Sequence, residues 1–279
     1  MYKIHSEELS YQANSEQLFD RLRDLPQAIW LDSGKPRSLQ GRFDIISAYP
    51  ESVLESKNSM PITIDGQPTS IASDSFDCAI KLLNSIQPIE ALPDVPFVCG
   101  LIGFFGYDLG REVESITSSN HCATEIPDMR LGLYLWSLVV DHELRKTTLY
   151  FHSNCQKSLI EQLRHRLTKN YHEPSDSCNF KLSKRFKPTV SKFRYTQDIG
   201  RIKDYIAQGD CYQVNYAQHL SAPYQGDLWQ AYVDLRNANP APYSAFMQWD
   251  NQAILSLSPE RFIQALSDNG HIKAQTKPI

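Results

Sequence analysis

Apolar and polar residues recur along this chain with two different periods, which predict helices and strands. Four stretches repeat apolar residues every three or four positions, as amphipathic helices do. They cover residues 18–25, 76–86, 159–167 and 199–206. Residues 14–17 (Asn-Ser-Glu-Gln) have the spacing of a capping box before the first helix, and Pro26 is expected to end it. Ser75 is the expected cap of the second helix, and Gly209 follows the fourth as a helix-ending residue.

Shorter apolar runs predict strands at residues 28–31, 42–46 and 254–258. Two hairpins are predicted as well. One joins residues 133–140 and 147–152 through 141–143, and the other joins 262–266 and 272–275 through Asn269-Gly270. Helices and strands mix without the regular alternation of a doubly wound fold and without an internal repeat. The pattern therefore predicts an α+β protein with mainly antiparallel sheets.

The length of 279 residues predicts about two domains, at roughly 150 residues each. Regular patterning lapses from residue 171 to residue 192, where a polar stretch passes into one rich in Lys and Arg. We therefore expect an N-terminal region at 1–170, a linker at 171–192 and a second region at 193–279. The basic residues are expected to be solvated, and attraction of an anionic ligand or partner is the alternative. They are Lys181, Lys184, Arg185, Lys187, Lys192 and Arg194.

Composition argues against several classes of protein. The net charge of −4 is spread along the chain, whereas a nucleic-acid binder would need a basic excess. The longest apolar runs, residues 95–107 and 131–140, are too short to span a bilayer, and no signal peptide opens the chain. The six cysteines lie more than 20 residues apart without a C-x-x-C pair, which favours reduced thiols over a disulfide frame or a zinc site. We therefore expect a cytoplasmic protein with neither a nucleic-acid nor a membrane partner.

Two segments invite a chemical interpretation. Residues 100–110 contain four glycines but match neither the G-x-G-x-x-G nor the G-K-[ST] phosphate fingerprint, so close backbone packing is the favoured interpretation. Glu260 and Arg261 stand side by side where a strand begins. Such a pair is usually a surface ion pair, and a catalytic Glu260 is the alternative. The residue pattern alone reveals no self-evident active site.

Seven segments, taken together and in this order, resemble the chorismate-utilising enzymes, and most of all the branch of aminodeoxychorismate synthase component I. They are residues 31–34, 42–45, 103–111, 126–129, 209–215, 239–246 and 255–262. The resemblance runs from about Leu18 to Ile279. It implies the fold of anthranilate synthase component I, with mainly antiparallel sheets packed as a sandwich with outer helices, incomplete at the C-terminus. Ser244 favours the aminodeoxychorismate branch, because anthranilate synthases usually carry Met there.

The resemblance implies a transferase of para-aminobenzoate and folate biosynthesis. The family enzyme replaces the 4-hydroxyl of chorismate with an amino group, using ammonia from a separate glutaminase subunit and a Mg²⁺ ion that holds a substrate carboxylate. Glu260 matches the general acid, which would protonate the leaving hydroxyl. The attacking Lys of the family's Pro-Ile-Lys-Gly-Thr motif would follow Pro278-Ile279, and the Mg²⁺ ligands are expected farther downstream. We therefore expect no metal ligand in these 279 residues and no amination by this chain alone.

The resemblance also implies a tryptophan pocket, structural or regulatory, in the N-terminal part. The matching positions are Ser33, Gln40, Gly41, Arg42, Phe43, Pro242, Tyr243 and Ser244. Phe43 and Tyr243 would face the indole, while a serine and backbone groups would meet the polar end of the amino acid. The alternative is that both aromatics only fill the core. Two other functions stay open, namely anthranilate synthase component I and a non-catalytic module that binds tryptophan or docks a partner.

Overall fold

The fold comes from a computed structural model, which describes residues 2–57, 60–71, 74–87, 92, 94–114, 125–168, 179–268 and 271–278. The chain forms two compact units. The larger comprises Met1–Glu173 and Tyr232–Ile279, and the smaller comprises Pro174–Ala231. The predicted regions at 1–170, 171–192 and 193–279 remain predictions.

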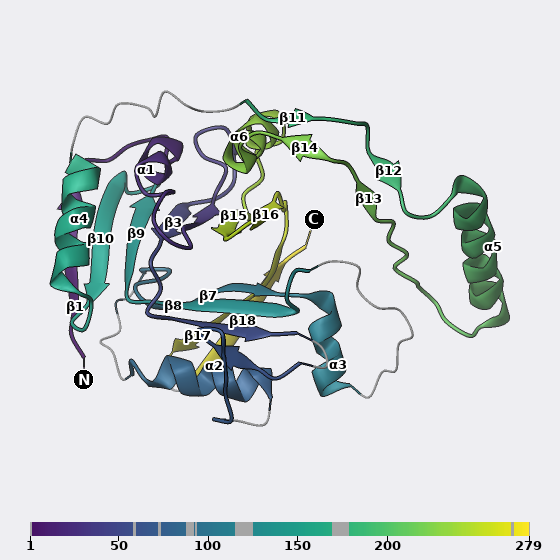
Figure 1. The fold of residues 1–279 in the computed structure, drawn as a ribbon, viewed down its shortest axis with the longest axis horizontal. Coiled ribbons are helices and arrows are strands. Elements are labelled where there is room, and N and C mark those ends of the chain that lie inside the picture. Colours follow the sequence, from purple (N-terminus) through teal and green to yellow (C-terminus); the bar gives the residue numbers. More distant parts are fainter. Residues whose placement is uncertain are drawn as a thin grey trace. The chain divides into compact units, whose positions relative to one another are not determined.

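Two antiparallel sheets build the larger unit (Figure 1). The seven-stranded sheet has the order β1 (Ile4–Leu9), β10 (Lys146–His152), β9 (Trp136–Asp141), β3 (Phe43–Ser47), β2 (Ile29–Asp32), β15 (Ser244–Trp249), β16 (Gln252–Ser256). The five-stranded sheet has the order β6 (Gln67–Pro68), β5 (Thr63–Ile64), β4 (Ser52–Ser56), β8 (Met129–Tyr134), β7 (Gly100–Phe105). Every strand pairing within the described ranges is antiparallel, so the predicted α+β class with mainly antiparallel sheets is confirmed.

Apolar side chains join the sheets to each other and to the helices outside them. Ile29 of β2 packs with Ile102 of β7 and Tyr134 of β8, which places one core cluster between the two sheets. The amphipathic helix α4 (Lys157–Thr168) buries four aliphatic residues and lies beside β10 (Figure 1). Helix α2 (Ser75–Asn84) packs on the other face of the five-stranded sheet, where Cys78 and Ala79 meet residues of β4 and β8.

The first two helices differ from their predictions in detail. Helix α1 (Glu16–Asp20) ends early, and turns carry the chain on to Leu25. The predicted capping box is wrong, because the cap residue is Ser15 and its side chain makes no capping hydrogen bond. The Asn14 side chain accepts instead from the Glu16 N–H, at 3.2 Å. The cap of α2 is Asp74 instead of Ser75, which lies inside the helix. The remaining short helices are η1 (Tyr107–Leu109), α3 (Gly110–Val113) and α6 (Leu228–Ala238), which crosses from the range of the smaller unit into that of the larger.

Both predicted hairpins are present. Strands β9 and β10 pair around residues 141–146, as predicted. The predicted strand 133–140, however, is divided, because β8 ends at Tyr134 in one sheet and β9 begins at Trp136 in the other. Its apolar run is continuous because both strands are almost entirely buried, which hides the boundary from the pattern.

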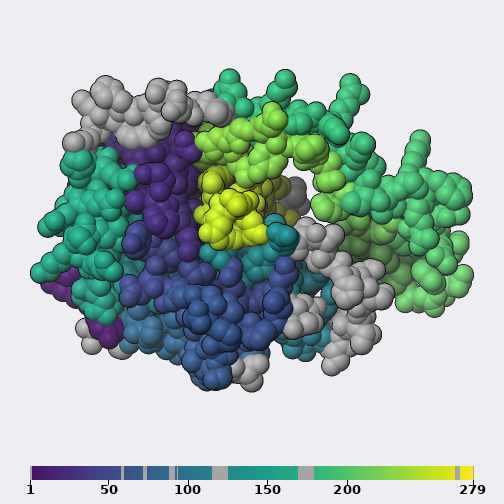
Figure 2. Space-filling view, in the orientation of Figure 1, coloured from purple at the N-terminus to yellow at the C-terminus, as the bar shows by residue number. Residues whose placement is uncertain are grey.

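The second hairpin consists of β17 (Arg261–Asp268) and β18 (His271–Lys277). The proposed turn residues Asn269-Gly270 lie outside the described residues. Strand β18 is exposed along its whole length, and the yellow C-terminal residues lie at the surface of the view in Figure 2. The exposed apolar side chains of this hairpin include Phe262 of β17 and Ile272 of β18, at 86% and 77% exposure.

The smaller unit contains two short strand pairs and one helix. Strand β11 (Lys181–Leu182) pairs with β14 (Tyr224–Gln225), and β12 (Lys187–Pro188) pairs with β13 (Leu220–Ser221). Helix α5 (Lys192–Gln208) ends at Gly209, whose left-handed φ of +81° confirms the predicted stop. The six basic residues of the cluster are all exposed, and an anionic ligand for them remains a prediction. Across the described part of the chain, the helices lack the combined length and apolar content that crossing a bilayer requires.

Candidate functional site

A buried ion pair fixes the end of strand β2. Asp32 accepts hydrogen bonds from Arg236 of α6, with Nε at 2.6 Å and Nη2 at 3.1 Å. The Tyr232 hydroxyl donates to Asp32 at 2.8 Å, and the Gly34 N–H donates at 2.7 Å. Burial raises the pKa of Asp32 despite the Arg236 guanidinium, and the charge of Asp44 adds to the rise. The pair is sealed from water, because Arg236 is only 2% exposed.

A second buried carboxylate, Asp44 of β3, holds Ser33. Asp44 Oδ1 accepts from the Ser33 N–H at 2.6 Å and from the Ser33 hydroxyl at 2.7 Å. Asp44 Oδ2 lies 2.9 Å from His142 Nε2, and Tyr11 Oη lies 3.1 Å from His142 Nδ1. Burial by itself would raise the pKa of Asp44, but hydrogen bonds from His142 and the Ser33 backbone outweigh it and hold that pKa below its usual range. Ser33 is therefore fixed by a charged, fully buried acceptor.

A third pair of polar side chains, Arg42 and Asp141, lies where strand β3 begins and strand β9 ends. Arg42 contacts both carboxylate oxygens of Asp141, with Nη2 to Oδ2 at 2.7 Å, and its guanidinium lies 4.4 Å from the centre of the Phe43 ring. Burial opposes ionisation of Asp141, yet the hydrogen bonds from Arg42 lower the pKa of that carboxyl. Because successive strand residues point to opposite faces, Phe43 lies on the other face of the sheet from Asp44.

Three of the segments proposed to bind tryptophan are in close contact. A Cβ on Gly41 would lie 2.5 Å from the Ser33 carbonyl oxygen, and one on Gly34 would lie 2.8 Å from the Ala241 carbonyl oxygen. Both glycines have left-handed φ angles, +92° and +72°, that favour glycine. Ser244 pairs with Asp32 in the strand register, and its hydroxyl donates to the Ala241 carbonyl at 3.0 Å. The fold therefore brings residues 33–34, 41 and 241–244 together.

The other proposed pocket residues are placed less uniformly. Pro242 and Tyr243 are half-buried beside Ser244, whereas Gln40 is exposed. Arg42 is bonded to Asp141, and the Phe43 ring contacts the Arg42 guanidinium, as described above. The tryptophan pocket remains a prediction.

Glu260 lies at an exposed turn between β16 and β17. Its N–H donates to the Ser258 hydroxyl at 3.2 Å, and that hydroxyl donates to the Glu260 carbonyl at 2.9 Å. Arg261 does not pair with its neighbour Glu260 but donates to Gln275, and its guanidinium lies 5.9 Å from the Tyr243 ring centre. The Tyr243 N–H donates to the Ser258 carbonyl at 3.1 Å, which ties this turn to residues 242–244.

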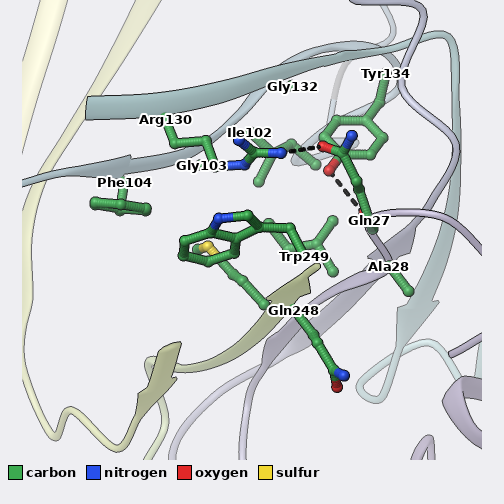
Figure 3. Close-up of a pocket in the computed structure, with 12 residues that line it drawn as sticks. Gln27, Ala28, Ile102, Gly103, Phe104, Arg130, Gly132, Tyr134, Gln248 and Trp249 are labelled. Carbon is green, nitrogen blue, oxygen red and sulfur yellow. Dashed lines mark hydrogen bonds between the residues drawn. The ribbon is translucent and has the colours of Figure 1, made fainter. Parts of the chain in front are cut away.

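A small cavity lies between the sheets, next to Arg130 (Figure 3). Arg130 Nη2 donates to the Gln27 side chain at 3.0 Å, and its guanidinium lies 5.1 Å from the Trp249 ring. The Tyr134 hydroxyl donates to the Gln27 carbonyl at 2.9 Å. The volume of this cavity is about 20 Å³, which is room for one water molecule and far too little for an amino acid.

Two glycines of the glycine-rich segment, Gly103 and Gly106, allow close backbone packing, in line with the favoured interpretation. A Cβ on Gly103 of β7 would lie 1.9 Å from the Arg130 carbonyl oxygen, and one on Gly106 would lie 2.9 Å from the Asp128 carbonyl oxygen. The strand edge of β7 and helix α2 also border an apolar groove of about 420 Å³. At Gly103 and Gly106 the neighbouring backbone approaches too closely for a larger residue.

Comparison with known proteins identifies the family. The model of the chorismate-binding enzymes matches residues 26–279. The chain belongs to the chorismate-binding enzyme family. Aminodeoxychorismate synthase component 1 of Klebsiella aerogenes is 36% identical to it over 268 residues, covering 95% of this chain and 57% of that protein. Anthranilate synthase component 1 of Pseudomonas aeruginosa is 27% identical, covering 88% of this chain and 54% of that protein.

A solved structure shows the same fold. Anthranilate synthase component I from Streptococcus pneumoniae TIGR4 superimposes with a TM-score of 0.67 at 25% identity, over 85% of this chain and 54% of that chain. The expected anthranilate synthase-like fold is thereby confirmed. This chorismate-binding enzyme chain spans a little over half the length of the relatives that it matches.

The described residues do not fit the Mg²⁺ ion that the resemblance implies. Among them, no group of three or more His, Cys, Asp or Glu side chains is placed to hold a metal ion. We therefore assign no step to a metal in this chain, and the expected downstream ligands remain a prediction.

Sequence reasoning missed the polar groups that organise the site, namely Asp44, His142, Tyr232 and Arg236. One signal was available. Asp44 stands inside the apolar strand Phe43–Ser47, where a charged residue is expected to face the core and require a partner. The partners themselves come from distant segments of the chain, which the pattern does not reveal.

Proposed function

We propose that this chorismate-binding enzyme is an aminodeoxychorismate synthase component 1, which converts chorismate and ammonia to 4-amino-4-deoxychorismate. The observation that carries the proposal is the 36% identity over 95% of the chain to a protein of that name, against 27% to an anthranilate synthase. Ser244, where anthranilate synthases usually carry Met, supports the same choice. A glutaminase subunit would supply the ammonia, as the designation component 1 implies a second component.

Glu260 is proposed as the general acid of this reaction. Hydroxide is a poor leaving group, so a carboxylic acid that gives its proton to the departing 4-hydroxyl would lower the barrier. Glu260 is exposed at the start of β17, where its side chain is accessible to a substrate. The bond from the Tyr243 N–H to the Ser258 carbonyl links the backbone beside Glu260 to the segment proposed to hold tryptophan.

The tryptophan pocket is the second element of the proposal. Ser33 is buried and fixed, and because its hydroxyl hydrogen goes to Asp44, its oxygen lone pairs remain acceptors for an ammonium group. The contacts among residues 33–34, 41 and 241–244 support a common site for the polar end of the amino acid. A cytoplasmic location is also proposed, supported by the buried residues Cys78, Cys99 and Cys155, which form no disulfide bond within the described part of the chain.

The product of the reaction tests the main proposal. The protein expressed from its complete reading frame is incubated with chorismate, an ammonium salt and Mg²⁺, and the products are separated by chromatography and identified by mass spectrometry. We expect 4-amino-4-deoxychorismate. Formation of anthranilate would instead favour the related activity, and no amine product would contradict both.

Two variants test the role of Glu260 in the same assay. Glu260→Gln is expected to slow turnover by about 100-fold or more, the usual contribution of a positioned acid. Glu161→Gln, on the exposed face of α4, is the control and should leave turnover unchanged. Equal activity in both variants would remove Glu260 from the mechanism.

A further inference from the structure

We propose that His142 is a positioning residue of the tryptophan pocket, acting through Asp44 on Ser33. The inference rests on the proposed function, because it assigns a role within the pocket proposed there. It concerns a residue of the β9–β10 turn, far along the chain from the residues that the family resemblance matches to the pocket.

A continuous line of hydrogen bonds joins His142 to Ser33. Tyr11 Oη lies 3.1 Å from Nδ1 of His142, Nε2 lies 2.9 Å from Asp44 Oδ2, and Asp44 Oδ1 accepts from both donors of Ser33. The histidine backbone is fixed as well, since its N–H donates to the Arg42 carbonyl at 3.0 Å. Three segments of the chain, the β9–β10 turn, strand β3 and the loop after β2, are therefore linked through one carboxylate.

Burial makes this link specific. The side chains of His142 and Asp44 are 5% and 0% exposed. Water therefore does not reach Oδ2 to replace the imidazole. Loss of this donor would lower the free energy of unfolding, because the buried carboxylate would lose a hydrogen bond. The buried guanidinium nearby, that of Arg236, is held by Asp32. His142 is thus the side chain that bonds Oδ2 of Asp44.

The imidazole also fixes which way Asp44 faces. With Oδ2 held by His142, Oδ1 is left toward Ser33, where it receives the N–H at 2.6 Å and the hydroxyl at 2.7 Å. Without the imidazole, Oδ2 would lose the bond that sets the plane of the carboxylate, and the Ser33 hydroxyl would no longer be held in a single orientation. The Ser33 oxygen would then meet a ligand ammonium group in several orientations, which weakens binding.

Two amide variants separate positioning from general packing. The Gln amide nitrogen reaches the place of Nε2, whereas that of Asn reaches only the place of Nδ1. In isothermal titration of the full chain with L-tryptophan, we therefore expect His142→Gln to bind within about threefold of the unmodified chain. His142→Asn is expected to bind about tenfold more weakly, the effect of losing one hydrogen bond to a charged group. Urea unfolding checks that each variant is folded.

A double-variant comparison and a matched histidine complete the test. If His142 acts through Ser33, then Ser33→Ala combined with His142→Asn should bind no more weakly than Ser33→Ala alone. His152 is fully buried at the end of β10, and it contacts neither Asp44 nor Ser33 among the described residues. His152→Asn should therefore alter stability without altering the tryptophan affinity.

The outcomes distinguish this inference from the proposed function. Absence of tryptophan binding by the unmodified chain would refute the pocket and the positioning role together. Binding that His142→Asn leaves unchanged, or losses that add fully to those of Ser33→Ala, would refute only the positioning role. Failure of His142→Gln to fold would also contradict it, because the inference assigns His142 a role that a glutamine amide fills.

Discussion

Replacement of Arg236 by leucine tests the buried ion pair most directly. Arg236 is 2% exposed and donates two hydrogen bonds to Asp32, while its guanidinium lies 4.9 Å from the Trp30 ring. Leucine keeps apolar bulk at this position but removes every N–H donor. Asp32 would keep its hydrogen bonds from Tyr232 and Gly34, but its negative charge would be left in the core without its cation.

The expected loss of stability is large. Removing one member of a buried pair costs about 3–5 kcal/mol, because the remaining charge is neither solvated nor compensated. The free energy of unfolding of a domain is about 5–15 kcal/mol, so Arg236→Leu should remove a substantial share of it at neutral pH. The exposed pair of Arg164 and Glu7, with side chains 47% and 30% exposed, is the control. Arg164→Leu should cost no more than about 1 kcal/mol.

The loss of stability in Arg236→Leu is expected to depend on pH if an uncompensated carboxylate causes it. Burial already raises the pKa of Asp32, and removal of Arg236 should raise it further. A carboxyl whose folded pKa lies above its unfolded value, about 3.9, stabilises the fold at low pH and loses that contribution as the pH rises through the folded pKa. The difference in stability between the variant and the unmodified chain should therefore grow as the pH rises above the folded pKa of Asp32 in the unmodified chain.

Urea unfolding followed by tryptophan fluorescence measures this difference at each pH. Effects of pH shared by both proteins cancel in the comparison. A loss below about 1 kcal/mol for Arg236→Leu, equal to that of Arg164→Leu, would refute the assignment of a buried pair. A large loss that does not change with pH would show that lost packing, instead of an uncompensated carboxylate, causes the effect.

Three further predictions follow from packing. Gly103→Ala should lower the free energy of unfolding by about 1–3 kcal/mol or more, because its Cβ would lie 1.9 Å from a backbone oxygen of β8. Gly110→Ala, whose Cβ would meet nothing within 4 Å, should change that free energy by less than about 0.5 kcal/mol. Leu163→Ala should cost about 2–5 kcal/mol, because α4 buries this side chain completely. Burial raises the pKa of Cys99 and Cys155 to about 11, so iodoacetamide at about pH 8 should label their peptides only after unfolding.

Urea unfolding decides the first two predictions, and peptide mass spectrometry decides the third. Equal stability of the two glycine variants would mean that β7 shifts away from β8 without cost. A loss under about 1 kcal/mol for Leu163→Ala would mean that α4 is not part of the core. Rapid labelling of Cys99 or Cys155 in the folded chain would contradict the burial of that thiol.

Local signals explain which elements could be predicted from the sequence. Helix α4 has a complete apolar stripe, and the β9–β10 hairpin has polar residues at its turn, so each is encoded within about a dozen neighbouring residues. The face of α2 was harder, because its pattern placed Phe76 and Ile80 inward while the structure leaves them 39% and 56% exposed. Its packing depends on which sheet the helix meets, and that is a tertiary property.

The site could be predicted only in part. The family resemblance supplied Ser33, Ser244 and Glu260, but not the groups that hold them. Arg236 lies 204 residues from Asp32 along the chain, and His142 lies 98 residues from Asp44. Contacts between residues so far apart in sequence are formed by the tertiary fold. They produce no periodic pattern in the sequence from which they could be predicted.

The passage from β8 to β9 makes the length of the chain critical at one point. Leu135 alone separates Tyr134, whose hydroxyl reaches Gln27, from Trp136, whose indole N–H reaches the Ala48 carbonyl. One inserted residue here would turn one strand over and exchange its inward and outward side chains in a single step. Insertion scanning should therefore find residue 135 intolerant of any change in length, although exposed turns elsewhere absorb extra residues at little cost.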